Sequence, residues 1–143
     1  MMKKTINSTA DMMDFGAKLG AELQGGEVIE LIGDVGAGKT TFTKGLAKGL
    51  AITETVQSPS FTISRIYDGR LELVHYDFYR LNDAGVMALE LADNLSDAEK
   101  VVVIEWAETV ADILPKERIR IKISSPSETE RVLEVENWQG GAL

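Results

Sequence analysis

The chain has 143 residues, of which 44% are hydrophobic and 27% charged, a composition typical of a soluble globular protein with a single domain over residues 1–143. It contains no cysteine, which excludes disulfide bonds and thiolate-ligated metals. Its formal net charge of −8 argues against a chain that grips DNA or RNA by itself, since affinity for the phosphate backbone comes mainly from lysine and arginine. No apolar stretch approaches the roughly 18 residues of a membrane span, and the first residues lack the apolar core of a secretory signal, so we expect a cytoplasmic protein that does not enter membranes.

The first part of the chain predicts a helix followed by a buried strand. Ser8 or Thr9 can cap a helix over residues 10–24, and two glycines then end it. Apolar residues recur on one face of this helix, at Met12, Phe15, Leu19 and Leu23. Residues 27–32 are apolar enough for a buried strand.

The stretch from Gly33 to Thr40 reads Gly-Asp-Val-Gly-Ala-Gly-Lys-Thr and matches the phosphate-loop pattern. Its glycines allow the backbone to approach a ligand closely, so successive N–H groups can bind phosphate at the start of a helix. Lys39 can reach the β- and γ-phosphates, and the hydroxyl of Thr40 can bind Mg²⁺, which prefers oxygen ligands. A glycine-rich turn between a strand and a helix would not require the Lys-Thr pair, so we predict a nucleotide site here.

A second helix and a hairpin follow the loop. The helix covers residues 41–50. Its inward stripe consists of Phe42, Leu46 and Leu50. Strands at 63–67 and 70–76 are joined by the short turn Asp68-Gly69 and must therefore be antiparallel.

The remaining elements complete an α/β pattern. They are a helix at 86–92, an acidic surface segment at 93–100, a buried strand at 101–104, a short helix at 107–114, strands at 118–124 and 131–136, and a flexible tail at 139–143. We therefore predict an α/β fold with one P-loop NTPase-like domain, in which flanking helices cover a mixed, mostly parallel sheet with an antiparallel hairpin.

Two carboxylates follow predicted strands. Glu105 comes after four apolar residues, and ligands of doubly wound sheets bind at the carboxyl ends of the strands, so we predict that Glu105 works at the nucleotide. A solvated or helix-capping carboxylate is the alternative. Asp77 also ends a strand, and the residues leave open whether it serves catalysis or a metal, or forms a surface pair with Arg80.

Several polar and aromatic residues have two interpretations each. Trp106 can stack on a base or pack beside the core strand. His75, the only histidine, lies in a strand and is more typical of packing or hydrogen bonding than of catalysis. Ser60 and Thr62 lie after the phosphate-loop helix, where either a nucleotide-sensing switch or a polar loop would fit.

Four motifs occur in order along the chain. They read Gly-Asp-Val-Gly-Ala-Gly-Lys-Thr-Thr-Phe, then Ser-Pro-Ser-Phe-Thr, then His-Tyr-Asp-Phe-Tyr-Arg-Leu, then Ile-Glu-Trp-Ala-Glu followed by Ile-Leu-Pro. Over about residues 8–136 the chain resembles the bacterial TsaE (YjeE) family. Members of that family are small P-loop ATPases with a mixed sheet, and they support formation of threonylcarbamoyladenosine beside the tRNA anticodon in a complex with TsaD and TsaB.

The resemblance implies a role for each matching position. Lys39, Asp77 and Glu105 would be catalytic, with Thr40 and Glu105 placing Mg²⁺. The residues that it implies in contact with ATP or ADP are Thr9, Val35, Gly36, Ala37, Gly38, Lys39, Thr40, Thr41, Trp106 and Arg131. Ser60 and Thr62 would belong to a switch-like segment, Ser60 standing where many relatives have threonine. The chain would be a Mg²⁺-dependent ATPase that is weak without its partners, and TsaD would handle the tRNA.

Three other functions compete with this one. A small-molecule kinase usually needs an arginine-bearing lid, and no arginine cluster occurs between residues 82 and 100. A GTPase would need the guanine-recognising Asn-Lys-x-Asp motif, which the sequence lacks. A chain that binds ATP or ADP only as a signal for assembly stays open on sequence alone.

Overall fold

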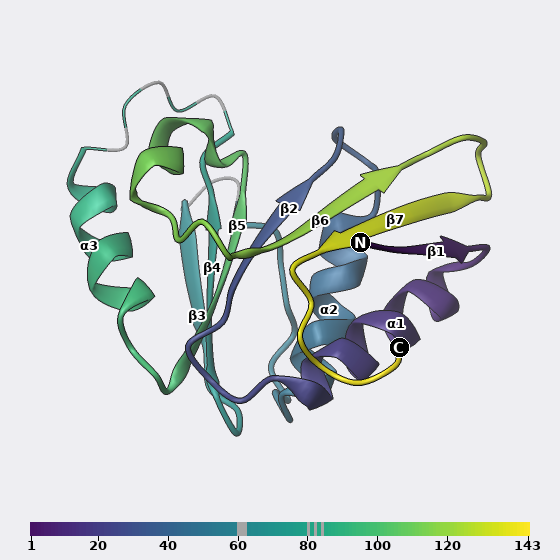
Figure 1. The fold of residues 1–143 in the computed structure, drawn as a ribbon, viewed down its shortest axis with the longest axis horizontal. Coiled ribbons are helices and arrows are strands. Elements are labelled where there is room, and N and C mark those ends of the chain that lie inside the picture. The colour runs from purple at the N-terminus through teal and green to yellow at the C-terminus, as the bar shows by residue number, and fades with distance from the viewer. Residues whose placement is uncertain (60–62, 80, 82, 84) are drawn as a thin grey trace.

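A computed structural model describes residues 1–59, 63–79, 81, 83 and 85–143. These residues form one seven-stranded sheet, in the order β1-β7-β6-β2-β5-β4-β3, with helices on both of its faces (Figure 1). The strands are β1 (Met2–Ile6), β2 (Val28–Ile32), β3 (Ser64–Tyr67), β4 (Glu72–Asp77), β5 (Lys100–Glu105), β6 (Ile119–Ser124) and β7 (Arg131–Glu136). The helices are α1 (Thr9–Glu22), α2 (Lys39–Gly49), α3 (Val86–Leu95) and a short 3₁₀ helix at Ala107–Ile113.

The centre of the sheet is parallel and its two edges are antiparallel. Strand β2 lies between β5 and β6 and runs parallel to both, and β5 is also parallel to β4. The hairpin of β3 and β4 forms one edge, and β6, β7 and β1 form the other. The predicted mixed sheet with an antiparallel hairpin is confirmed. Strand β5, next to the central strand β2, is apolar on both faces, because helices cover both sides of the sheet there.

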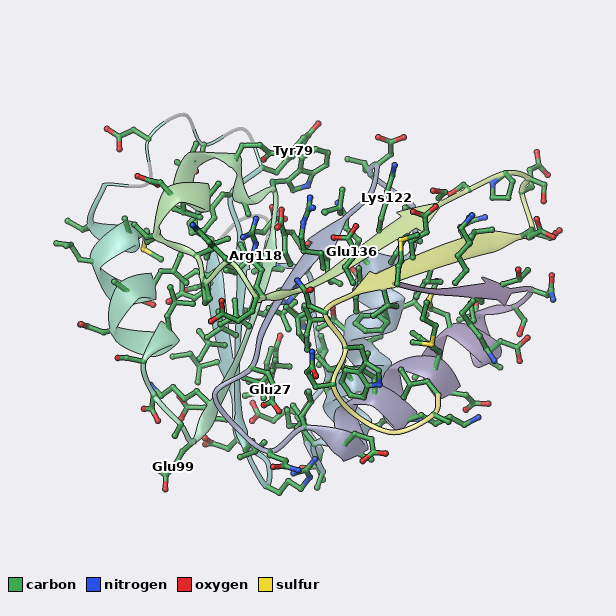
Figure 2. All side chains as sticks on the ribbon, in the orientation of Figure 1. Glu27, Tyr79, Glu99, Arg118, Lys122 and Glu136 are labelled. Atoms are coloured by element: carbon green, nitrogen blue, oxygen red, sulfur yellow. The ribbon has the colours of Figure 1, made fainter. Side chains whose placement is uncertain are left out.

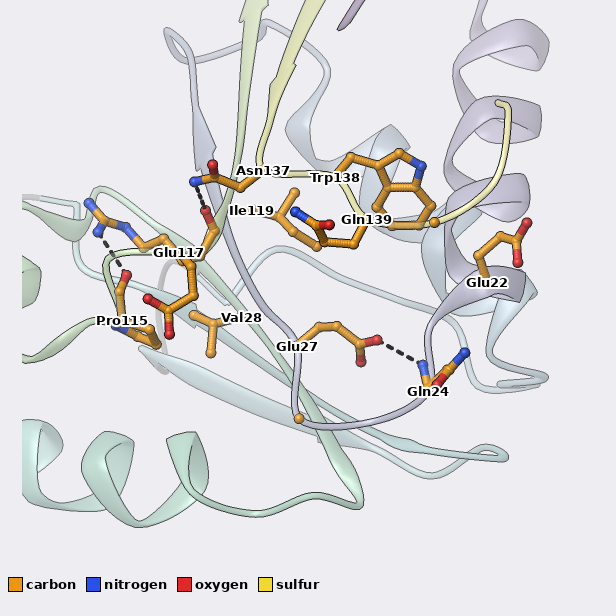
Figure 3. A pocket seen from close by; sticks show the side chains of 13 residues that line it. Glu22, Gln24, Glu27, Val28, Pro115, Glu117, Ile119, Asn137, Trp138 and Gln139 are labelled. Atoms are coloured by element: carbon orange, nitrogen blue, oxygen red, sulfur yellow. Dashed lines mark hydrogen bonds between the residues drawn. The ribbon is translucent and has the colours of Figure 1, made fainter. Parts of the chain in front are cut away.

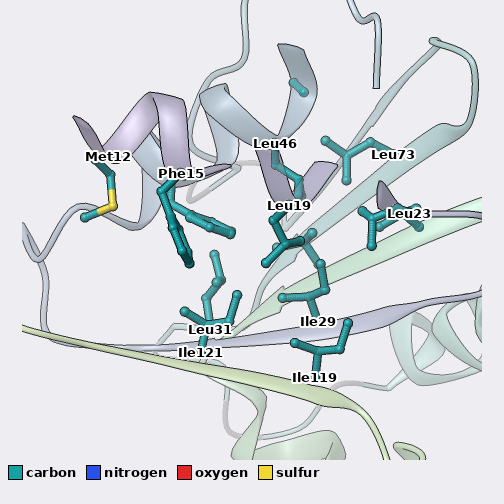
Figure 4. Packing of buried hydrophobic residues seen from close by; sticks show 14 of the residues in the cluster. Met12, Phe15, Leu19, Leu23, Ile29, Leu31, Leu46, Leu73, Ile119 and Ile121 are labelled. Atoms are coloured by element: carbon teal, nitrogen blue, oxygen red, sulfur yellow. The ribbon is translucent and has the colours of Figure 1, made fainter. Parts of the chain in front are cut away.

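Helices α1 and α2 cover one face of the sheet and bury the two stripes predicted from the sequence (Figure 4). The rings of Phe15 in α1 and Phe42 in α2 lie 6.2 Å apart between centroids. The helices approach each other closely at Gly45, where a Cβ atom would lie 2.2 Å from the carbonyl oxygen of Met13. This contact packs the second half of α2 tightly against α1, and the phosphate loop lies at the other end of the same helix.

Helix α3 and the 3₁₀ helix cover the opposite face, over a second cluster of buried apolar residues. There the hydroxyl of Tyr76 accepts a hydrogen bond from the side chain of Asn94 and donates one to Glu90. Helix α3 runs to Leu95, three residues beyond the predicted end, and buries Asn94 inside a segment that the sequence predicts to be surface. No helix within the described ranges has the length and apolarity that crossing a membrane requires.

Strand β1 is an element that the sequence pattern does not predict. It pairs antiparallel with β7, and only its last residue, Ile6, is fully buried. The lysine at the inward position 4 hides the alternation that would otherwise mark a strand. At the other end of the chain, Leu143 packs against the α1–α2 core, and the indole of Trp138 donates to the carbonyl of Gly141. A flexible tail at 139–143 stays a prediction.

Candidate nucleotide site

The predicted phosphate loop joins the carboxyl end of β2 to the first residue of α2. A hydrogen bond from the backbone N–H of Ala37 to the carbonyl of Asp34 closes the loop into a tight turn. Gly38, the residue before the helix, has φ of 113°, a left-handed value that a side chain would strain. The sequence therefore places glycine where the loop needs to turn its N–H groups toward an anion at the head of α2.

The side chain of Lys39 is buried and paired. Its Nζ donates to the carbonyl of Gly33 at 2.7 Å, lies 3.7 Å from Oε1 of Glu105, and sits 4.2 Å from the ring centroid of Trp106. A buried ammonium needs such partners because removing a charge from water is costly. These contacts hold the amine beside the loop, within reach of the phosphates that the loop would bind.

The two predicted carboxylates lie side by side at the carboxyl ends of neighbouring parallel strands. In the parallel pairing of β4 and β5, Asp77 stands directly opposite Glu105, and both are nearly fully buried, at 6% and 4% exposed. Asp77 accepts a hydrogen bond from the backbone N–H of Tyr79 at 2.9 Å. Asp77 is therefore not a surface residue. The alternative predicted from the sequence, a pair with Arg80, cannot be compared, because Arg80 lies outside the described residues.

Two aromatic rings lie above these strand ends. The rings of Tyr79 and Trp106 are 4.7 Å apart between centroids, and Tyr79 is 41% exposed at the margin of the sheet (Figure 2). Trp106 has φ of 56° and ψ of 56°, a left-handed conformation that is uncommon outside glycine. This turn directs the indole back over Lys39 directly after the buried strand ends.

Two of the cavities that border the phosphate loop contain most of the residues predicted for the nucleotide. The first, of about 470 Å³, is lined by Val35, Gly36, Gly38, Lys39, Thr40, Thr41, Ser58, Asp77, Tyr79, Glu105 and Trp106. The second, of about 370 Å³, is lined by Ile6, Asn7, Ser8, Thr9, Met12, Gly36, Ala37, Gly38, Thr41, Glu128, Thr129 and Arg131. Gly36, Gly38 and Thr41 line both cavities, so the two cavities lie on either side of the loop and the start of α2.

The second cavity explains how two distant residues join the site. Thr9 begins α1 and Arg131 begins β7, yet both line the cavity beside the loop. The Nε of Arg131 donates to the carbonyl of Ala37 at 3.1 Å, which fixes the guanidinium against the loop. Trp106 lines the first cavity and a smaller one, of about 290 Å³, that borders Gly33 and Asp34, but it does not line the cavity of Thr9 and Arg131.

The remaining residues near the site are the predicted switch residues and two residues to which the sequence assigned no role in nucleotide chemistry. Ser60 and Thr62 lie outside the described residues, whereas the neighbouring Ser58 lines the first cavity. Sequence reasoning assigned no role at the site to Tyr79 and only packing or hydrogen bonding to His75, which is fully buried and bonded to Glu105. The signal for His75 was its spacing, because a residue two positions before Asp77 in a strand points to the same face.

A further cavity lies at the opposite end of β2. Its volume is about 440 Å³, and Trp138, Glu27, Glu117 and Ile119 are among its lining residues (Figure 3). Val28, the first residue of β2, lines this cavity, and the phosphate loop follows Ile32, the last residue of β2. The two sites therefore lie at opposite ends of the strand. The cavity contains none of the residues predicted for the nucleotide.

The loop, the buried lysine and the strand-end carboxylates define a nucleotide-binding α/β domain of the P-loop class. Residues 6–133 match the family described as "Threonylcarbamoyl adenosine biosynthesis protein TsaE". The chain belongs to the TsaE family.

Relatives and a solved structure agree with this assignment. The chain is 48% identical to the tRNA threonylcarbamoyladenosine biosynthesis protein TsaE of Bacillus subtilis over 107 residues, covering 74% of this chain and 66% of that protein. It is 38% identical to the protein of the same name from Treponema pallidum, covering 94% of this chain and 99% of that one. The crystal structure of Bacillus subtilis YdiB superimposes with a TM-score of 0.78 at 34% identity, covering 96% of this chain and 86% of that one.

Proposed function

We propose that the chain binds ATP with Mg²⁺ and hydrolyses it slowly, as the ATPase subunit that acts with TsaD and TsaB in threonylcarbamoyladenosine modification of tRNA. One observation carries this proposal. Lys39, Asp77 and Glu105 line one cavity beside the phosphate loop, at the carboxyl ends of the parallel strands. The relatives carry the name of this pathway, which supports a role in tRNA modification.

The two cavities suggest how the nucleotide lies. The phosphate loop would bind the phosphates between them, with the nucleoside in the cavity of Thr9 and Arg131 and the γ-phosphate toward Lys39 and Asp77. Arg131 would border the nucleoside while it steadies the loop through Ala37. Trp106 would lie against the phosphate end, over the amine of Lys39, and not against the base.

The donor atoms near the loop fit magnesium. Thr40 and Glu105 offer a hydroxyl and a carboxylate from the wall of the first cavity, and Mg²⁺ is held in such sites by one or two protein oxygens together with phosphates and water. Bound there, the ion would neutralise charge on the phosphates. Thr40 and Glu105 are the residues that would hold it.

The protein's own residues would then carry out hydrolysis by position and charge. Lys39 would leave the carbonyl of Gly33 and bind the β- and γ-phosphate oxygens, over which the negative charge of the transition state is spread. Asp77, buried at the strand end, would orient a water molecule and accept its proton. Water attacks the γ-phosphorus, the bond to the β-phosphate oxygen breaks, and ADP and phosphate leave.

The partners and the charge of the chain fit one division of labour. A net charge of −8 opposes binding to tRNA by this subunit, so TsaD would hold the tRNA while this chain hydrolyses ATP. A complex that modifies tRNA would act in the cytoplasm, and we expect this chain to be there. We expect a gel-shift assay to show no binding of tRNA to the isolated chain at physiological salt.

A steady-state ATPase assay tests the proposal, with and without TsaD and TsaB. We expect slow hydrolysis by the chain alone, faster hydrolysis with the partners, and losses of about 100-fold or more in Lys39→Ala and Glu105→Ala. Lys44→Ala is the matched control, because Lys44 is exposed on the same helix and should leave activity unchanged. Normal hydrolysis by Lys39→Ala would refute the site. Nucleotide binding with no hydrolysis, even with the partners, would instead favour the assembly signal.

A further inference from the structure

His75 is a buried residue that the proposed chemistry leaves without a role. It lies in β4, is 0% exposed, and shares the face of the sheet that carries Asp77 and Glu105. Its Nε2 lies 2.5 Å from Oε2 of Glu105. This is a short contact between a ring nitrogen and the carboxylate that would hold the metal.

The chemistry of the two groups decides where the hydrogen lies. An ionised carboxylate only accepts hydrogen bonds, so Nε2 of His75 must donate to Oε2 of Glu105. The other nitrogen, Nδ1, is buried and has no hydrogen-bond partner among the described residues. A hydrogen on Nδ1 would therefore be buried without an acceptor, which is unfavourable. The geometry therefore places a hydrogen on Nε2, where Glu105 accepts it.

The two oxygens of Glu105 consequently face different neighbours. Oε2 is held by His75, and Oε1 lies 3.7 Å from Nζ of Lys39, on the side of the phosphate loop. A carboxylate that is held at one oxygen cannot rotate freely. Hydrogen bonds from a second residue are a general means by which proteins orient metal-binding side chains.

We propose that His75 is a positioning residue, which holds Oε2 of Glu105 so that Oε1 is presented to the metal and nucleotide. The inference rests on the proposed function, because it gives Glu105 the metal. His75 touches neither nucleotide nor metal and acts only through Glu105. A purely structural histidine would contribute to stability and leave the dependence on Mg²⁺ unchanged.

The first experiment reads the contact directly and needs no nucleotide. His75 is the only histidine, so a two-bond ¹H–¹⁵N spectrum of the labelled chain contains a single imidazole. We expect the pattern of a ring with its hydrogen on Nε2, and a change of this pattern in Glu105→Ala. A ring without a hydrogen on Nε2, or a spectrum that Glu105→Ala leaves unaltered, would overturn the inference.

The second experiment measures how much Mg²⁺ half-maximal ATP hydrolysis requires. His75→Leu removes the donor, and we expect it to raise this concentration by about 10-fold to 100-fold while ATP binding without Mg²⁺ stays near normal. His75→Gln, which keeps an N–H of similar reach, should restore the dependence to within about threefold. Tyr76→Phe is the matched control, because Tyr76 is the next residue of β4 and is buried on the opposite face.

The outcomes distinguish a failure of the proposed role of His75 from a failure of the proposed ATPase function. If the wild-type chain hydrolyses ATP with Mg²⁺ and His75→Leu has the same Mg²⁺ requirement, the role of His75 is refuted and the proposed function stands. An equal shift in His75→Leu and Tyr76→Phe would also refute it, since loss of stability would then explain both. If the wild-type chain shows no Mg²⁺-dependent hydrolysis, the proposed function and the role of His75 fail together.

Discussion

The close approach of α1 and α2 gives a prediction that follows from distances alone. A Cβ atom at Gly45 would lie 2.2 Å from the carbonyl oxygen of Met13 and 2.9 Å from its Cα. Ordinary contacts of this kind are 3.4–4 Å, so Gly45→Ala would force the helices apart by about 1 Å. The clashing atom belongs to the backbone of a packed helix and cannot rotate away, as the end of a side chain could.

The size of the effect follows from two opposing contributions. Overpacking a core costs typically 1–3 kcal/mol, and a backbone clash places Gly45→Ala near the upper limit, at about 3 kcal/mol. Alanine is favoured over glycine inside a helix by about 0.5–1 kcal/mol. We therefore expect a net loss of about 2 kcal/mol, which lowers the melting temperature of a chain of this length by about 4–8 °C.

Urea unfolding followed by far-ultraviolet circular dichroism measures this loss. The midpoint should fall while the slope with denaturant stays unchanged, because the unfolded chain exposes the same surface. Lys48→Ala, at an exposed position of α2, is the control and should remain within about 0.5 kcal/mol of the wild-type chain. If Gly45→Ala equals or exceeds the stability of the wild-type chain, helix propensity dominates and the helices are not as close as the structure indicates.

Three more predictions concern the strand-end residues and the tryptophans. Asp77→Asn should keep ADP binding, measured by calorimetry, and should lower the rate of ATP hydrolysis by about 100-fold. Hydrolysis at the wild-type rate would contradict the role of the carboxylate. Burial raises the pKa of the Tyr76 hydroxyl above its ordinary value of 10.0. The unfolded chain therefore loses this proton first, so stability falls above about pH 10 by at most about 1.4 kcal/mol per pH unit, and Tyr76→Phe should remove that slope in urea titrations at successive pH values. Trp138→Phe leaves Trp106 as the single tryptophan, and ATP should change its fluorescence by drawing Lys39 from its ring, with no such change once Lys39 is alanine.

Local patterns predicted most of the elements because each pattern reflects a burial that the fold then supplies. The apolar run before Glu105 became the buried interior strand β5, and the stripes on α1 and α2 became their inner faces. The glycines and Lys39 of the phosphate loop likewise predicted a tight turn at the head of a helix. Where a pattern was absent, as in the lysine-containing β1, prediction failed, because an edge strand buries too little to leave a periodic signal.

The sequence by itself determined the phosphate loop, the α/β class and the strand-end positions of Asp77 and Glu105, since all of these follow from residue types within a few positions of each other. Only the tertiary structure decided that Arg131 and Thr9 reach the loop, that Trp106 lies over Lys39, and that His75 holds Glu105. These contacts join residues far apart in the chain. The physical reason is that strand order and register, which set them, depend on how the whole core packs.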